Sequence, residues 1–132
     1  MPLRILLVED YPDCAAMTAA VLREYGHNVE TVPDGPTALA ACRRERPDAV
    51  LLDIGLPRMS GHEVAKQLRA EFGVATPKLI AVTGYGRRSN HQLSAAAGID
   101  AHLVKPVDWR ELHLMLGELE RSKQEAVNGS AP

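Results

Sequence analysis

The chain has 132 residues and a mass of 14.3 kDa, the size of one ordinary domain, which leaves no room for a second. Hydrophobic residues make up 45% of it, so it can bury a core without disulfides or metal ions, and disorder of the bulk is excluded. The net charge of -2 and the pI of about 6.2 provide no basic surface for non-specific nucleic-acid binding. We therefore expect no nucleic-acid partner.

The longest apolar runs, residues 5–8 and 49–52, are too short to cross a membrane. The N-terminal residues lack the long apolar segment and the cleavage site of a signal peptide. The two cysteines, Cys14 and Cys42, fall on apolar faces of expected helices, which favours small buried thiols that stay reduced over a disulfide or a metal site. The sequence predicts a soluble, cytoplasmic protein with no membrane partner.

Short apolar runs alternate with helical patterns five times along the chain, which is typical of a parallel sheet covered by helices. We expect strands at residues 4–9, 28–32, 49–53, 78–83 and 101–104. The first, third and fourth runs are almost continuously apolar, as strands covered on both faces are, whereas the second alternates like an edge strand.

Helical patterns follow each expected strand. An apolar stripe at helical spacing predicts the first helix, and Gly26 is placed to end it. The residues of the stripe are Cys14, Met17, Val21, Leu22 and Tyr25. The second helix is expected from residue 35 to just before residue 46, the third at about 64–72, and a fourth, with the weakest pattern, at about 87–97. A capping pattern at residues 108–111 begins a fifth helix. We expect the domain to cover residues 1–121 and a polar, disordered tail to cover residues 122–132.

Polar side chains stand where four of the expected strands end. Glu9 and Asp10 follow the first strand, and Asp53 ends the third. Thr83 ends the fourth strand and Lys105 follows the fifth. Because ligands of open parallel sheets bind at the carboxyl ends of the strands, we expect these five side chains to meet at one edge.

This combination of side chains suits a metal ion and a phosphoryl group. Three crowded carboxylates repel one another unless a cation neutralises them, and a donor set made only of oxygen favours Mg²⁺ over Zn²⁺. Lys105 adds a positive charge and Thr83 a hydrogen-bond donor. Together they could neutralise a phosphoryl group carried by an aspartate.

Over residues 3–121 the sequence resembles the response-regulator receiver domains of two-component signalling systems. The motifs that carry the resemblance occur in family order, and they are residues 5–10 (ILLVED), 51–57 (LLDIGLP), 59–61 (MSG), 82–84 (VTG) and 103–106 (LVKP). The resemblance implies an α/β fold with a five-stranded parallel sheet of order 2-1-3-4-5 and five helices on its two faces.

The resemblance also implies a role for each residue of the edge. Asp53 would be the phosphoacceptor, and Glu9 and Asp10 would bind Mg²⁺ together with Asp53 and the backbone carbonyl of Gly55. Glu9 stands where the family more often has aspartate. Gly55 offers no side chain to orient an attacking water, so the lifetime of the phosphate stays open.

The resemblance also implies a switch, formed by Thr83 and His102, and a charge partner for Asp53, which is Lys105. Thr83 would be the hydroxyl that responds to phosphorylation, and Lys105 would pair with Asp53 or its phosphate, followed by a cis bond to Pro106. His102 occupies the position of the family's aromatic switch residue. A histidine titrates near neutrality, so the resemblance implies a switch that is weaker or pH-sensitive, while a half-buried strand histidine is an equal alternative.

The implied function is signalling by phosphotransfer. The phosphoryl donor would be a phosphohistidine of a sensor histidine kinase or a histidine phosphotransfer protein, and the output would be a protein-binding surface at the fourth helix, fifth strand and fifth helix. The domain would not be an enzyme with a separate substrate, although it would assist its own phosphorylation and dephosphorylation. We expect a monomer or a weak dimer.

Two other functions compete with this one. A phosphorylation-independent interaction module is favoured only by His102. A flavodoxin-like cofactor carrier is excluded because residues 9–13 present carboxylates where a phosphate-binding loop needs glycines and N–H groups. Residues 102–108 resemble receivers of hybrid sensor kinases more than those of transcription factors, and both a stand-alone regulator and part of a larger kinase remain open.

Overall fold

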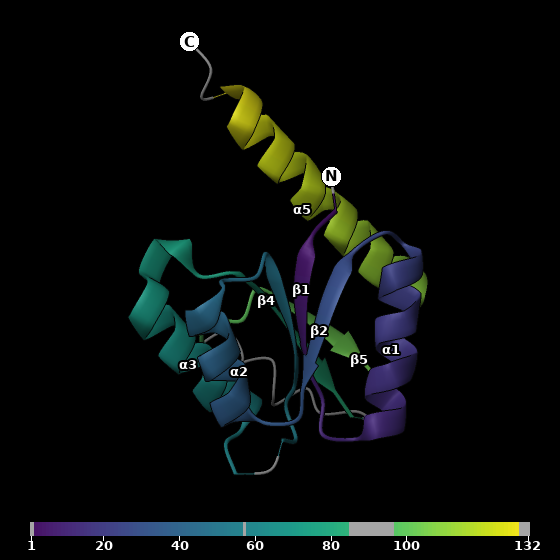
Figure 1. Ribbon diagram of the computed structural model, residues 1–132, viewed down its shortest axis with the longest axis vertical. Coiled ribbons are helices and arrows are strands. Elements are labelled where there is room, and N and C mark those ends of the chain that lie inside the picture. The colour runs from purple at the N-terminus through teal and green to yellow at the C-terminus, as the bar shows by residue number, and fades with distance from the viewer. Residues whose placement is uncertain (1, 57, 85–96, 130–132) are drawn as a thin grey trace.

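Five short parallel strands form the centre of the molecule (Figure 1). They are β1 (Arg4–Val8), β2 (Asn28–Val32), β3 (Ala49–Asp53), β4 (Lys78–Thr83) and β5 (Ala101–Val104). The computed structural model describes residues 2–56, 58–84 and 97–129. The strand order β2-β1-β3-β4-β5 confirms the predicted topology.

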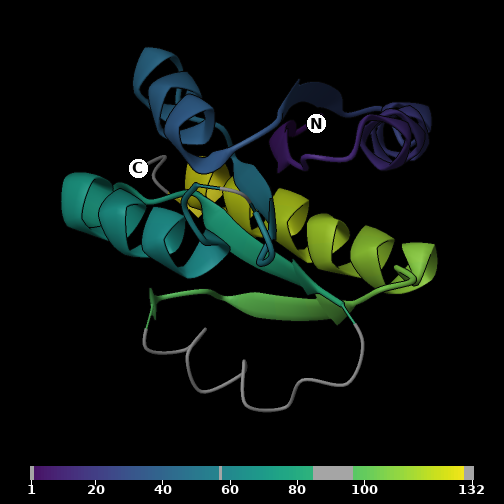
Figure 2. The same cartoon turned by 90° about the horizontal axis from the view of Figure 1, so that it is seen from below.

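The register aligns the strands so that their carboxyl ends share one edge. Strand β1 pairs with β2 through Ile5 opposite Val29, and with β3 through Ile5 opposite Ala49. Strand β4 continues the sheet with Leu79 beside Val50. Because all pairs are parallel, strands β1, β3, β4 and β5 end at the same edge of the sheet, which Figure 2 shows from below.

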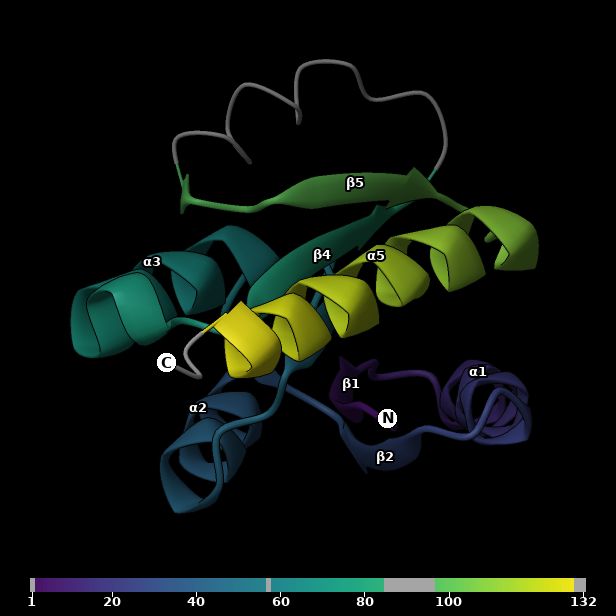
Figure 3. The ribbon, with the colours of Figure 1, turned by 90° about the horizontal axis from the view of Figure 1, so that it is seen from above.

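Helices cover both faces of the sheet. The described helices are α1 (Pro12–Glu24), α2 (Gly35–Arg44), α3 (Gly61–Phe72) and α5 (Trp109–Gly129), with a 3-10 turn at Gly73–Ala75. Helices α1 and α5 lie on one side and α2 and α3 on the other (Figure 3). The helix expected at residues 87–97 falls outside the described residues except for Ala97, which is buried.

The core has two layers because successive strand residues point to opposite faces. Leu6, Val50 and Leu52 pack with α2 and α3, while Leu7 and Leu51 pack with α1 and α5. The four-residue run of β1 is therefore buried on both sides. This explains why its sequence is continuously apolar instead of alternating.

Helix α1 turns a different face to the sheet than its apolar stripe predicts. Its buried residues are Ala15, Thr18, Ala19 and Leu22. Met17 and Tyr25 are exposed and Cys14 is only half-buried. The small alanine side chains allow the helix to approach the strands closely, and the large side chains are left at its margins.

The C-terminal helix is longer than predicted. Helix α5 continues to Gly129, so the expectation of a disordered tail from residue 122 is wrong as far as that residue. Residues 123–126 are good helix formers, and Lys123 pairs with Asp48 at the amino edge of the sheet. The extra turns extend past the rest of the fold (Figure 1). None of the described helices combines the length and apolar composition that crossing a membrane requires.

Candidate functional site

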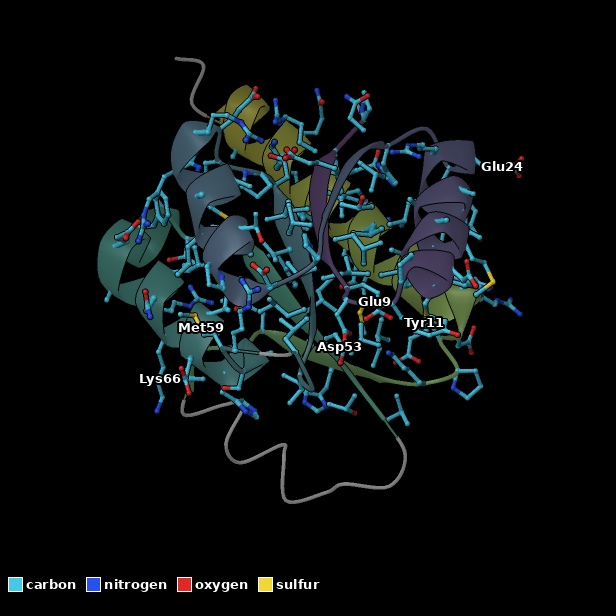
Figure 4. The ribbon with its side chains drawn as sticks, turned by 60° about the horizontal axis from the view of Figure 1, so that its bottom comes forward. Glu9, Tyr11, Glu24, Asp53, Met59 and Lys66 are labelled. Atoms are coloured by element: carbon cyan, nitrogen blue, oxygen red, sulfur yellow. The ribbon has the colours of Figure 1, made fainter. Side chains whose placement is uncertain are left out.

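Three carboxylates lie together at the carboxyl edge of the sheet. Glu9 and Asp10 follow β1, Asp53 ends β3, and one oxygen from each lies within 4.8 Å of the others. The Glu9 side chain is only 6% exposed and that of Asp53 15%, whereas Asp10 is open to solvent. Figure 4 shows Glu9 and Asp53 side by side at this edge. The structure thus brings together the acidic residues that the strand ends predict.

Lys105 joins two of these carboxylates. Its Nζ lies 3.2 Å from Glu9 Oε1 and 3.2 Å from Asp53 Oδ2. Its backbone N–H donates to the carbonyl of Thr83, which fixes the chain where it leaves β5, and the Lys105–Pro106 bond is cis. One ammonium therefore shares its charge between two carboxylates on different strands.

Burial and pairing change the acidities of the three groups. Burial raises the pKa of Glu9, and the hydrogen bond and charge of Asp53 raise it further. Burial also acts to raise the pKa of Asp53, but hydrogen bonds from Glu9 and the Gly55 N–H, and the charge of Lys105, lower it overall. For Lys105, the attraction of both carboxylates outweighs burial and raises the pKa. Asp53 therefore stays ionised, and Glu9 takes up a shared proton more readily.

The donor set fits a hard divalent cation. Glu9 Oε2 is buried and has no hydrogen-bond partner among the described residues. An ionised oxygen in that position is costly unless a cation neutralises it. The three available ligand atoms are carboxylate oxygens, and the exposed Asp10 leaves room for water ligands. The acidic cluster is suited to hold such an ion.

The loop after β3 holds Asp53 from two sides. The backbone N–H of Gly55 donates to Asp53 Oδ1 at 3.0 Å. At Gly61, the first residue of α3, an added Cβ would lie 3.0 Å from the Asp53 carbonyl oxygen, so the helix must begin with a glycine to pack this closely. Ser60 caps the same helix by accepting the Glu63 N–H at 3.2 Å.

Thr83 and His102 occupy neighbouring strands. Thr83 is buried, and its hydroxyl lies 3.5 Å from the carbonyl oxygen of Leu103, to which it donates. His102 is half-buried within β5, where its register partner on β4 is Ala81. In this arrangement the Thr83 hydroxyl contacts the strand that carries His102.

Cys14 contacts the acidic cluster, which the sequence pattern did not predict. A hydrogen bond to Glu9 and burial raise the pKa of the Cys14 thiol, so the thiol stays protonated. A cavity of about 250 Å³ opens beside it, and its lining includes Cys14, Met17, Lys105 and Trp109. The position of Cys14 in the first turn of α1, directly after the acidic loop, is the signal that could have revealed this contact.

The chain has clear relatives among known proteins. A family model described as "Response regulator receiver domain" matches residues 5–117. The "Probable transcriptional regulatory protein TcrX" of Mycobacterium tuberculosis is 39% identical over 120 residues, which are 91% of this chain and 50% of that protein. The "DNA-binding response regulator MtrA" of Mycolicibacterium smegmatis is 41% identical over 109 residues, 83% of this chain and 46% of that protein. The chain spans about half the length of the curated relatives it matches.

Solved structures agree with this assignment. A "response regulator receiver domain protein (CheY-like)" from Methanospirillum hungatei superposes with a TM-score of 0.84 at 32% identity, covering 95% of this chain and 99% of that one. The receiver domain of the sensor histidine kinase PA1611 from Pseudomonas aeruginosa, solved with a magnesium ion coordinated in its active-site cleft, has a TM-score of 0.79 at 32% identity and covers 92% of this chain and 97% of its own. The chain therefore belongs to the response-regulator receiver domain family.

Proposed function

We propose that Asp53 accepts a phosphoryl group from a phosphohistidine and that this reaction requires Mg²⁺. The observation that carries the proposal is the pairing of an ionised Asp53 with Lys105 at 3.2 Å, beside two further carboxylates. An ionised carboxylate is the nucleophile that the reaction needs. The family membership of the chain supports the same assignment.

In the proposed reaction, one oxygen of Asp53 forms a bond to phosphorus while the bond between phosphorus and the donor imidazole nitrogen breaks. The imidazole leaves and takes up a proton from water, and the product is an aspartyl phosphate. The Nζ of Lys105 lies 3.2 Å from Asp53 Oδ2, so it would stabilise the negative charge of the carboxylate before the transfer and that of the phosphoryl oxygens after it. The Gly55 N–H holds the other oxygen in place.

The metal ion would be held by Glu9, Asp10 and Asp53 and by the carbonyl of Gly55. Bound there, it would neutralise the negative charge that an incoming phosphoryl group adds to the cluster. The buried Glu9 Oε2 without a hydrogen-bond partner supports this assignment. The magnesium ion named for the PA1611 receiver domain supports it as well.

The signal would leave the site through Thr83 and His102. We infer that the Thr83 hydroxyl exchanges its Leu103 partner for the phosphoryl group, which would change the surface of β5 and α5. His102 would respond as the family's switch residue does. The partners proposed for this domain are a sensor histidine kinase or a histidine phosphotransfer protein and a downstream protein. The domain would act as a cytoplasmic phosphoacceptor that assists its own chemistry, as a monomer or weak dimer.

Acetyl phosphate with Mg²⁺ provides the direct test. Intact-mass analysis should show the addition of one phosphoryl group to the wild-type chain and none to Asp53→Asn. Asp13→Asn is the matched control, because Asp13 is exposed in the first turn of α1 and makes no contact that the reaction uses. Stoichiometric phosphorylation of Asp53→Asn at an aspartate would refute the assignment.

A further inference from the structure

Two side chains cap the beginning of strand β1, at the end of the sheet opposite to Asp53. The backbone N–H of Leu3 donates to Nδ1 of His27 at 3.2 Å. The next N–H, that of Arg4, donates to Oδ2 of Asp48 at 2.8 Å. His27 precedes β2 and Asp48 precedes β3, so each side chain reaches across from a neighbouring strand.

The second polar atom of each capping side chain faces helix α5. His27 Nε2 lies 3.7 Å from Glu120 Oε1, and Asp48 Oδ1 pairs with the Nζ of Lys123. Figure 1 shows the N-terminus and the later turns of α5 at this same end of the molecule. His27 and Asp48 therefore both lie between β1 and α5. Asp48 is bonded to both elements, whereas His27 Nε2 faces Glu120 without a hydrogen-bond partner among the described residues.

The hydrogen-bond pattern fixes the protonation state of the imidazole. Nδ1 accepts the Leu3 N–H, so it carries no proton, and the single proton of the neutral ring is on Nε2, facing Glu120. A second proton can be added only at Nδ1. Two N–H donors would then face each other, and the side chain, only 1% exposed, has no access to water that could separate them. Protonation of His27 and the hydrogen bond to Leu3 exclude each other.

We propose that His27 is a proton-controlled latch that exchanges partners between β1 and α5. Neutral His27 holds Leu3, the residue directly before β1, whereas protonated His27 gives up the Leu3 N–H and pairs as a cation with Glu120. Acidification thereby loosens the start of β1 while α5 stays attached. Asp48 makes the matching connection without this exchange, because an ionised carboxylate accepts from both partners at once.

The charged groups around His27 determine the pH at which the latch changes partners. Glu120 and His113 face it from α5, and the amino terminus of the chain adds a third charge. Burial lowers the pKa of His27, and His113 and the amino terminus act in the same direction, while Glu120 opposes them without reversing the shift. The exchange is therefore expected on the acid side of the ordinary histidine range.

Amide hydrogen exchange by NMR tests the latch on the wild-type chain. Below the midpoint of His27, protection of the Leu3 amide should fall about tenfold for each pH unit, since only the neutral ring accepts its N–H. The Arg4 amide, which is capped by Asp48, is the internal reference and should keep its protection over the same range. The titration of the His27 ring signals gives the midpoint independently.

Two variants separate the latch from general acid unfolding. In His27→Gln, an amide oxygen can accept the Leu3 N–H without titrating, so protection should lose its extra pH dependence. In Glu120→Gln, the midpoint should move to lower pH, because the charge that favours the imidazolium is gone. The latch would be overturned if Leu3 stayed protected while the ring signals of His27 report an imidazolium. An unchanged midpoint in Glu120→Gln would overturn it as well. The Glu120→Gln result tests the proposal even if His27→Gln does not fold. Phosphorylation of Asp53 takes no part in either measurement.

Discussion

Two aspartates of this chain do opposite things for stability. Asp10 is exposed among like charges at the carboxyl edge, whereas Asp48 accepts the partly buried N–H of Arg4 and pairs with Lys123. In a chelating buffer we expect Asp10→Ala to leave the melting temperature unchanged or slightly higher, because it relieves repulsion. Asp48→Ala should cost about 1–3 kcal/mol, because it leaves a partly buried donor unpaired and removes the partner of Lys123.

Thermal or urea unfolding of both variants in chelator makes the comparison. A strong loss of stability in Asp10→Ala would mean that this carboxylate is structural, which would contradict its assignment to the metal site. Asp48→Asn is the intermediate case, since its side-chain oxygen can still accept the Arg4 N–H while the charge for Lys123 is lost. Its cost should be smaller than that of Asp48→Ala.

At the level of single residues, the sequence predicted which functional side chains lie near one another, but not which of them form pairs. Glu9, Asp10, Asp53 and Lys105 lie together because parallel strands deliver their ends to one edge. Lys105 pairs with two carboxylates at once, and burial and this pairing together shift the pKa values of all three groups. Both effects depend on distances of a few ångströms that no sequence pattern encodes. The same holds for His27, which is a dispersed histidine in the sequence and a buried bridge in the fold.

At the level of elements, the connection from residue 97 into β5 depends on one arginine of α3. Arg69 donates to the carbonyl of Gly98 from Nε at 2.9 Å and from Nη2 at 2.7 Å, and it also pairs with Asp100. Gly98 has a φ of +87°, and a Cβ there would lie 2.8 Å from Arg69 Cγ. The turn therefore needs glycine both for its backbone conformation and for space.

Gly26 supplies a matched comparison, because its φ is +92° but nothing lies within 4 Å of an added Cβ. Gly26→Ala should cost about 1–2 kcal/mol, which is the conformational strain alone. Gly98→Ala should cost about 1–2 kcal/mol more, because the arginine and its hydrogen bonds must move. Equal losses of unfolding free energy in the two variants would show that Arg69 does not hold this turn.

The strands were predictable and the helix ends were not, for a physical reason. Strands β3 and β4 are short apolar runs bounded by polar residues, as strands covered on both faces are, and they have the expected limits. The edge strands β2 and β5 also have the expected limits. The C-terminal end of α5 has no comparable pattern in the sequence. Its last turns carry no apolar stripe, and the pair that attaches them, Lys123 with Asp48, joins residues far apart in the chain.

At the scale of the whole molecule, strand order was implied by the family resemblance and not by the residues alone. An apolar run indicates that a segment is buried in a sheet, but it does not indicate which strand lies beside it. The two core layers, one under α2 and α3 and the other under α1 and α5, follow once the order is known, since alternate residues of each strand point to opposite faces. The acidic edge is then a property of the assembled sheet.

The assembled edge predicts that Mg²⁺ stabilises the entire domain. The ligand oxygens come from the ends of β1 and β3, which separate on unfolding, so the ion should bind only the native state. At a concentration about ten times its dissociation constant, a ligand of this kind adds about 1.4 kcal/mol to the free energy of unfolding. The melting temperature should therefore rise steadily with Mg²⁺ and return to its starting value in chelator. Asp10→Asn should lose this dependence while Asp13→Asn, an exposed aspartate of α1, keeps it. A rise of the same size in Asp10→Asn would show that the ion acts elsewhere on the surface.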